Sequence, residues 1–479
     1  MSSPLNAKSQ EQRKIPLLAR LQQLSQVSDA AFYTPGHKRG RCVNDNLQNL
    51  LGQLVFKADL PELPELDNLF NPEGIIAEAQ QLAALAFGAT QTWFLVNGST
   101  CGIMASIMAT CDMGDKILLP RNIHTSAIAG LIISGAIPIF INPEYDSVQD
   151  IAYSVTPTAI EKTIKQHPDA KAVMILYPTY QGICGDISKI AEITHKYGLP
   201  LLVDEAHGAH FAFHGDLPPS ALSMGADLTV QSTHKVLGAM TQAAMLHIQG
   251  EKIEPFKISK ALQLLQSTSP SYLLLASLDA ARQQMALLGK ELLAKTLQLA
   301  ETAISHLKTI KGISVLEFEP KPGFNYFDRT RLTVDVSQLG LTGFTADEIL
   351  HQQLGVTCEL PLPKHLTFII TFGNNLEDID KLIQAFKILA NSHKREENSI
   401  STTECRLPTS NYSISPRQAF FASTETLPIQ QSINRICGEL ICPYPPGIPV
   451  LMPGEIITSE AIDYLQQVLV FGGKVTGCS

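Results

Sequence analysis

A short turn that carries glycine and hydroxyl side chains follows an apolar run near residue 98. The run FLVNGST (94–100) leads from apolar residues into Gly98, Ser99 and Thr100. A helix that begins at such a turn offers open backbone N–H groups and the positive end of its dipole, and the hydroxyls add donors. The pattern therefore favours a bound phosphate, although ordinary capping of a helix by Ser or Thr would leave the same pattern.

A carboxylate follows a second apolar run. In LLVDEAHG (201–208), Asp204 comes directly after Leu-Leu-Val, which predicts the carboxyl end of a buried strand. Ligands of open α/β sheets bind at that edge. A carboxylate there could keep a pyridine nitrogen protonated, but it could also bind a metal ion or cap the following helix.

A lysine follows a third apolar run, in QSTHK (231–235). Lysine is rarely buried, so Lys235 at a strand end needs a partner or a chemical role. Schiff-base chemistry requires a lysine amine of lowered pKa. Ser232 and His234 could reach a phosphate from the side opposite to Ser99. Taken alone, Lys235 would be interpreted as a surface lysine.

Together the three runs supply what pyridoxal 5'-phosphate (PLP) requires from a protein. PLP needs an amine for its aldehyde, a carboxylate at its pyridine nitrogen, a phosphate cradle and a group stacked on its ring. For the stacked group the sequence offers His124, in PRNIH (120–124), and His207 as its rival. A hydrogen-bonded core histidine is the ordinary alternative for either one.

The elements that must position these residues alternate between strands and helices. Apolar runs predict strands at residues 92–96, 116–119, 137–141, 172–176, 201–203, 228–231 and 243–248. Helices are predicted at 14–28, 74–87, 100–110 and 187–197, and long helices without strands at 253–310. This alternation predicts an α/β protein with a doubly wound sheet covered on both faces.

Short strands return after the long helices, at 314–317, 331–335, 356–359 and 367–371, and predict a smaller α+β domain. The polar stretch 391–410 is predicted to be a connector, and the Pro- and Gly-rich stretch 443–455 an ordered loop. We therefore divide the chain into residues 1–40 (helical segment and active-site loop), 41–285 (PLP-binding large domain), 286–395 (small α+β domain) and 396–479 (C-terminal domain).

The charge, cysteine content and apolar stretches of the chain limit the partners and the location that we expect. The formal net charge of −9 argues against nucleic acid, which needs clustered Lys and Arg. The nine cysteines form no C-x-x-C pair and no group with zinc-ligand spacing, so we expect no metal site and a reducing compartment. Neither a signal peptide nor an apolar stretch long enough to span a bilayer is evident, so the sequence predicts a cytoplasmic protein without a membrane partner.

The wording and order of the motifs resemble the fold-type-I ornithine/lysine/arginine decarboxylases. The matching stretches are TPGHKRG (34–40), the run 66–102 with NPEGIIAEAQ and FLVNGST, LLPRNIHTSAIAGLIISGAIP (118–138), YPTYQGICGDI (177–187), LLVDEAHGAH (201–210), QSTHKVLGAMTQAAMLH (231–247), TSPSYLLLASLDAAR (268–282) and YPPGIPVLMPGE (444–455). They cover most of residues 30–290 and part of the tail. The resemblance implies the aspartate aminotransferase fold, with a mostly parallel seven-stranded sheet in the large domain.

The resemblance also implies roles for individual residues. Lys235 matches the Schiff-base lysine, Asp204 the partner of the pyridine nitrogen, and His124 the histidine stacked on the ring. The residues that match phosphate ligands are Ser99, Thr100, Ser232 and His234, beside Gly98 of the turn. His207 remains a second candidate for the cofactor.

The implied reaction is decarboxylation of a basic amino acid to a polyamine precursor and CO2, with arginine favoured over lysine or ornithine. His37, in the loop 34–40, and Glu455 are the candidates for binding the substrate. A rigid loop could present the Glu455 carboxylate to the distal cation of the substrate, but a surface glutamate after a Pro-Gly turn is an equal alternative. A homodimer or higher homo-oligomer with shared active sites is typical of this fold type.

Two departures and two alternatives remain. The chain lacks the long amino-terminal receiver-like domain of the large enterobacterial members, so it resembles the short branch, and their decameric assembly is not assumed. Another reaction of this fold type, such as transamination, desulfuration or aldol cleavage, is one alternative, and a non-catalytic homologue is the other. The scarcity of arginine around residues 361–372 favours decarboxylation over transamination, because aminotransferases use an arginine there to hold the α-carboxylate.

Overall fold

A seven-stranded sheet forms the centre of the large domain. The computed structural model describes residues 10–393, 412–444 and 448–478. The strands of this sheet are β1 (Gln91–Leu95), β2 (Lys116–Pro120), β3 (Ile137–Ile141), β6 (Ala170–Leu176), β8 (Leu201–Asp204), β9 (Leu228–Gln231) and β10 (Ala244–Ile248). Their order is β1-β10-β9-β8-β6-β2-β3, and β10 is antiparallel to both of its neighbours while the other pairs are parallel. The predicted sheet is confirmed.

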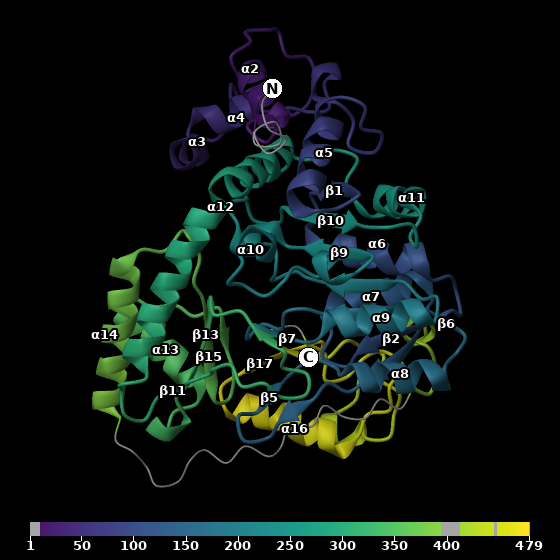
Figure 1. The fold of residues 1–479 in the computed structure, drawn as a ribbon, viewed down its shortest axis with the longest axis vertical. Coiled ribbons are helices and arrows are strands. Elements are labelled where there is room, and N and C mark those ends of the chain that lie inside the picture. Colours follow the sequence, from purple (N-terminus) through teal and green to yellow (C-terminus); the bar gives the residue numbers. More distant parts are fainter. Residues whose placement is uncertain (1–9, 394–411, 445–447, 479) are drawn as a thin grey trace.

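Helices cover both faces of this sheet (Figure 1). They are α5 (Ile75–Phe87), α6 (Gly98–Thr110), α7 (Thr125–Ser134), α8 (Pro157–Gln166), α9 (Ile187–Lys196), α11 (Pro255–Leu265) and the first part of α12 (Tyr272–Leu307). Successive strand residues enter two separate cores: Leu201 and Val203 lie in one, and Leu202 lies in the other. Because both faces are buried, the strands are apolar throughout rather than alternating.

The amino-terminal segment packs against the large domain through α2 (Pro16–Ser25), which contacts α12 and α5. It continues through α3 (Asp45–Leu51) and α4 (Gln53–Ala58), which lie near α2 at the top of Figure 1, and then through η1 (Pro64–Leu66). A buried ion pair on α12 holds this segment in place. Asp279 accepts a hydrogen bond from the backbone N–H of Leu17 at 3.0 Å, and Arg282 donates to the carbonyl of Gln12 at 2.8 Å.

The small domain is a four-stranded antiparallel sheet with helices on it. Its strands are β11 (Ser314–Val315), β13 (Arg331–Asp335), β14 (Leu360–Pro361) and β15 (His365–Ile369), in the order β11-β13-β15-β14, and its helices are α13 (Gly343–Leu354) and α14 (Leu376–Ser392). The predicted strand at 356–359 is wrong. The backbone N–H of Val356 instead closes the end of α13 on Leu350, and the pairing with β15 that defines β14 begins only at Leu360. The strand predicted at 367–371 lies two residues earlier, at 365–369.

Smaller elements connect these units. They are β4 (Tyr145–Asp146), β5 (Ile151–Ala152), β7 (Ile183–Cys184), β12 (Tyr326–Phe327), α10 (Thr233–Val236), η2 (Phe211–Phe213), η3 (Leu222–Met224) and η4 (Ser337–Leu339). Strand β12 of the small domain pairs with β7 of the large domain. Helix α12 runs without a break through residues 285 and 286, so the proposed division between the two domains lies within a shared helix.

The carboxyl-terminal segment has its own core and also contacts the large domain. It contains α15 (Pro416–Phe420), η5 (Ile429–Gln431), β16 (Cys442–Tyr444), α16 (Ser459–Val470) and β17 (Lys474–Thr476). Leu451 belongs to its own core, whereas Met452 packs into the core of the large domain. Residues 394–410 of the predicted connector and 445–447 of the predicted loop lie outside the described residues. None of the helices in the described ranges has the length and apolar composition that a membrane span requires.

Candidate active site

The candidate residues lie at one edge of the central sheet. Strands β1, β2, β6, β8 and β9 point the same way, so the residues that follow them meet at the carboxyl edge. Gly98 follows β1, His124 follows β2, Asp204 ends β8 and Lys235 follows β9. This is the edge where the sequence analysis expects a ligand.

The turn at Gly98 begins α6, and the first backbone N–H groups of a helix have no partner within the helix. Gly98 has a φ of +74°, a conformation that favours glycine. Within the described residues, the side chain of Asn97 makes no capping hydrogen bond to α6. The hydroxyl oxygens of Ser99 and Ser232 lie 2.6 Å apart, so the two predicted phosphate ligands converge from different elements. These features fit a phosphate cradle, and the next residue along α6, Thr100, is exposed.

Asp204 is a buried carboxylate at the end of β8. Its Oδ1 accepts a hydrogen bond from the backbone N–H of Ala206 at 3.2 Å. Burial raises the pKa of Asp204 to about 6, although the charge of Lys235 acts in the opposite direction. A buried carboxylate that binds a proton this tightly suits a cationic ring nitrogen as its partner.

Lys235 lies on the short helix α10, and its side chain points into the protein. Its Nζ lies 3.0 Å from Nε2 of His207 and 5.6 Å from the centre of the Tyr180 ring. Burial lowers the pKa of Lys235, although the charges of Asp204 and Glu359 raise it. The side chain of Lys235 is half-buried rather than fully solvated, and its burial shifts the amine toward its neutral, nucleophilic form.

Two further histidines lie near Lys235. His124 caps α7, where its Nδ1 accepts a hydrogen bond from the backbone N–H of Ser126 at 3.2 Å. Burial and the neighbouring charge of Lys235 lower the pKa of His124 to about 4, and the same two causes lower the pKa of His234. A neutral imidazole at His124 suits a flat ligand, because stacking on a ring needs no charge.

The two predicted substrate residues are already engaged within this chain. Glu455 is buried, accepts a hydrogen bond from the backbone N–H of Met452 at 2.8 Å and pairs with Arg121 at 3.2 Å. The alternative of a surface glutamate is therefore wrong. His37 pairs with Asp59, Nε2 to Oδ2, at 3.1 Å. Their roles toward a substrate stay predictions.

Several residues at this edge were not singled out from the sequence. Tyr180 follows β6, as the other candidates follow their strands, and its ring centre lies 4.4 Å from that of His207. Its place after an apolar run in YPTYQG was the signal that could have identified it. Arg331 and Asp328 come from the small domain and gave no such signal, because they approach His207 only through the tertiary fold.

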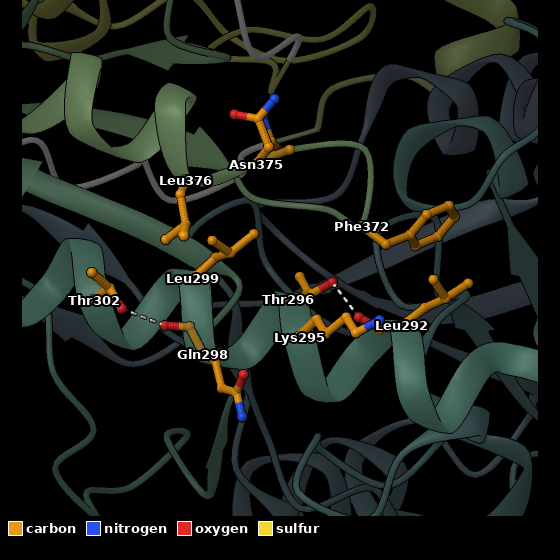
Figure 2. A pocket seen from close by; sticks show the side chains of 10 residues that line it. Leu292, Lys295, Thr296, Gln298, Leu299, Thr302, Phe372, Asn375 and Leu376 are labelled. Atoms are coloured by element: carbon orange, nitrogen blue, oxygen red, sulfur yellow. Dashed lines mark hydrogen bonds between the residues drawn. The ribbon is translucent and has the colours of Figure 1, made fainter.

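A cavity of about 440 Å³ lies elsewhere, between α12 and the start of α14 (Figure 2). Its lining includes Leu292, Leu299, Phe372 and Leu376. None of the residues that line it belongs to the edge with Lys235. In the described part of the chain we also find no group of three or more His, Cys, Asp or Glu side chains that could hold a metal ion.

Comparison with known proteins gives one family. The model described as "Orn/Lys/Arg decarboxylase, major domain" matches residues 15–322, and "Orn/Lys/Arg decarboxylase, C-terminal domain" matches residues 401–478. An arginine decarboxylase of Bacillus subtilis is 38% identical over 97% of this chain and 96% of its own length. One from Halalkalibacterium halodurans is 38% identical over 95% of this chain and 94% of its own length. The lysine decarboxylase LdcA of Pseudomonas aeruginosa is 25% identical over 94% of this chain and 75% of its own length.

Solved structures give the same fold. The lysine decarboxylase LdcF of Francisella novicida superposes with a TM-score of 0.81 at 23% identity, over 96% of this chain and 79% of that one. An alanine–glyoxylate aminotransferase from Nostoc sp. superposes with a TM-score of 0.53 at 18% identity, over 67% of this chain and 88% of that one. The predicted fold class is confirmed.

Proposed function

Because this chain belongs to the Orn/Lys/Arg decarboxylase family, we propose that it removes the α-carboxylate of L-arginine as CO2 and releases the corresponding amine. Family membership makes the chain a decarboxylase of basic amino acids. The choice of arginine is supported by the relatives named arginine decarboxylase, which are 37–38% identical, whereas those named lysine decarboxylase are 23–25% identical. Lysine and ornithine are the next candidates.

We propose PLP as the cofactor, and the residues at the sheet edge fit its parts. Lys235 would hold the aldehyde, and Asp204 the pyridine nitrogen. The open turn at Gly98 and the hydroxyls of Ser99 and Ser232 would hold the phosphate, with Thr100 and His234 beside them. His124 would lie against the ring. When bound, PLP supplies a ring that accepts the electron pair left when the bond to the α-carboxylate breaks.

The observation that carries the proposal is the environment of the Lys235 amine. It is partly enclosed, has a lowered pKa and lies 3.0 Å from His207, at the edge that also holds Asp204. A neutral amine can attack an aldehyde, whereas an ammonium cannot. The Asp204 carboxylate would keep the ring nitrogen cationic, and Lys235 or a neighbouring histidine would return a proton to Cα.

His37 and Glu455 fit this proposal only if each can bind the substrate while it keeps its present partner within the chain. A carboxylate has about four lone-pair sites, so Glu455 could accept from a guanidinium while it remains bound to Arg121. We also propose a homodimer or higher homo-oligomer with shared sites, a cytoplasmic location, and no nucleic-acid or membrane partner. The net charge of −9 supports the absence of a nucleic-acid partner.

The test is a comparison of substrates with the purified full chain and added PLP. CO2 and amine release are measured from arginine, lysine and ornithine separately, and we expect the highest kcat/KM for arginine. The matched control is Lys257→Ala on the surface helix α11, which should retain the wild-type rate, whereas Lys235→Ala should lose it. Release from lysine or ornithine alone would contradict the choice of substrate, and release from none of the three would contradict the proposed function.

A further inference from the structure

A buried arginine of the small domain lies against the histidine that contacts Lys235. Arg331 is the first residue of β13, and its Nη2 donates a hydrogen bond to the backbone carbonyl of His207 at 3.0 Å. The same Nη2 lies 3.4 Å from Nδ1 of His207. Nε2, on the other side of that imidazole, lies 3.0 Å from Nζ of Lys235. The three side chains therefore form a continuous row.

Asp328 forms a buried ion pair with Arg331. Its Oδ2 lies 3.8 Å from Nε of Arg331 and 3.1 Å from Nε2 of His210. Its Oδ1 accepts hydrogen bonds from the backbone N–H and the hydroxyl of Thr330 at 3.0 and 2.7 Å. The side chains of Arg331 and Asp328 both have 0% exposure. The ion pair between Arg331 and Asp328 is therefore closed off from solvent.

The chemistry of a guanidinium decides where the imidazole proton lies. Arginine has donors and no acceptor, so the Nδ1 of His207 that faces it must be the acceptor. A neutral imidazole then carries its proton on Nε2, and this N–H points at Nζ of Lys235. The free amine of Lys235 can accept that hydrogen bond through its lone pair, whereas an ammonium would set two donors against each other.

We propose that Arg331, paired with Asp328, is a positioning residue that fixes His207 in the Nε2–H tautomer and so stabilises the neutral form of the Lys235 amine. This inference rests on the proposed function of Lys235 as the residue that holds the PLP aldehyde. It adds a role for two residues of the small domain, whose placement then matters to a group on the large domain.

Other groups around Lys235 shift the pKa of its amine in both directions. The charges of Asp204 and Glu359 favour the ammonium, while burial and the charge of Arg331 oppose it. His124 and His234 are neutral neighbours with lowered pKa values, and the Tyr180 ring lies under the amine. Burial and the charges of Lys235 and Arg331 lower the pKa of His207 far below its usual value, which agrees with a neutral imidazole.

The test uses the cofactor-free full chain and needs no substrate. A limiting amount of a small reagent that reacts with neutral amines is added at a series of pH values. Mass spectrometry then gives the labelled fraction of Lys235 relative to that of other lysines in the same sample. In Arg331→Met we expect the apparent pKa of Lys235 to rise by about one unit. At pH values below that pKa, the labelling of Lys235 should therefore fall about tenfold. The matched control is Arg329→Met, an exposed arginine two residues away that should not shift it.

A double-mutant cycle separates two effects of Arg331 on the pKa of Lys235: the effect that acts through the tautomer of His207 and the direct effect of the arginine charge. In a His207→Phe background, Arg331→Met should shift the pKa of Lys235 by less than half as much as in the wild type. An equal shift in both backgrounds, or no shift in Arg331→Met, would overturn the proposal. If Arg331→Met fails to fold, the double variant Asp328→Asn/Arg331→Met removes both charges of the pair and carries the same expectation. A chain that fails to decarboxylate arginine could still show the shift, so the two failures are distinguishable.

Discussion

Replacement of Arg121 should release the carboxyl-terminal segment from the large domain. The side chain of Arg121 has no exposed surface and follows β2 directly. Its Nη1 donates to the carbonyl of Pro449 and its Nη2 to that of Val450, each at 2.8 Å, and Nη2 also pairs with Glu455. In Arg121→Met, two carbonyls and a buried carboxylate each lose the donor that Arg121 supplies.

The size of the effect follows from the burial of these groups. Removing one partner of a buried ion pair costs about 3–5 kcal/mol, because the other charge stays buried without compensation. Glu455 keeps the backbone N–H of Met452, so we expect a value near the lower limit, about 3 kcal/mol. At roughly 1.4 kcal/mol per factor of ten, undocking of this segment should become about 100-fold more populated.

Native-state proteolysis measures this population when opening and closing are fast relative to cleavage. The rate of cleavage within residues 448–478 is followed by mass spectrometry, and we expect it to rise about 100-fold in Arg121→Met. The matched control is Arg435→Met, which removes an exposed pair with Glu425 and should change the rate by less than about fivefold. Adding Glu455→Gln to Arg121→Met should restore part of the loss. A rate in Arg121→Met that equals the control would refute the reasoning.

Three further predictions concern the sheet edge. Lys235→Ala should lose the visible absorbance of bound PLP, because no amine remains to join the aldehyde; a band that persists after dialysis would assign another lysine. Asp204→Asn should stabilise the cofactor-free protein by up to about 3 kcal/mol at about pH 8 and not at about pH 4, measured by denaturant unfolding. The reason is that the pKa of Asp204 is about 6 in the folded chain and 3.8 in the unfolded chain. Ionised Asp204 therefore destabilises the folded state above pH 6, whereas protonated Asp204 costs nothing below pH 3.8. A gain that is equal at both pH values would contradict this. Ser99→Ala and Ser232→Ala should each weaken PLP binding by about tenfold or more, because a hydrogen bond to a charged group contributes roughly 1.5–3 kcal/mol; a change in the dissociation constant below threefold would argue against the cradle.

The large domain could be predicted from the sequence because its strands are buried on both faces. Such strands are continuous apolar runs, and the bounds of β9, which is buried along its whole length, were predicted without error. The bounds of β3, a partly buried strand at the edge of the sheet, were also predicted without error. In the small domain the signal is weaker. Residues 356–359 have the composition of a strand, but they connect α13 to β14, and only the pairing with β15 determines where β14 starts.

The candidate residues could be predicted where chemistry follows a strand. Asp204 and Lys235 each come after a buried run, and parallel strands bring such positions to one edge. Arg331 could not be predicted in this way, since it stands at the beginning of a strand in another domain. The scarcity of arginine around residues 361–372 pointed away from a small-domain arginine near the site, yet Arg331 reaches His207 from β13.

Glu455 shows the same limit. Its turn was visible in the sequence, but its partner Arg121 lies 334 positions away, and only the packed structure brings the two together. The position of Glu455 after Pro453 and Gly454 does not show whether its carboxylate is exposed. The buried ion pair with Arg121 shows that the carboxylate is not on the surface.

The most direct test of the account is to follow the carboxylate carbon of the substrate. The purified chain with PLP is given arginine labelled with 13C at the carboxylate, in D2O. We predict release of the label as 13CO2 and one deuterium at the former Cα of the amine product. A label that stays with the carbon skeleton, with the amino group passed to a keto acid, would contradict the assignment of this chain as a decarboxylase.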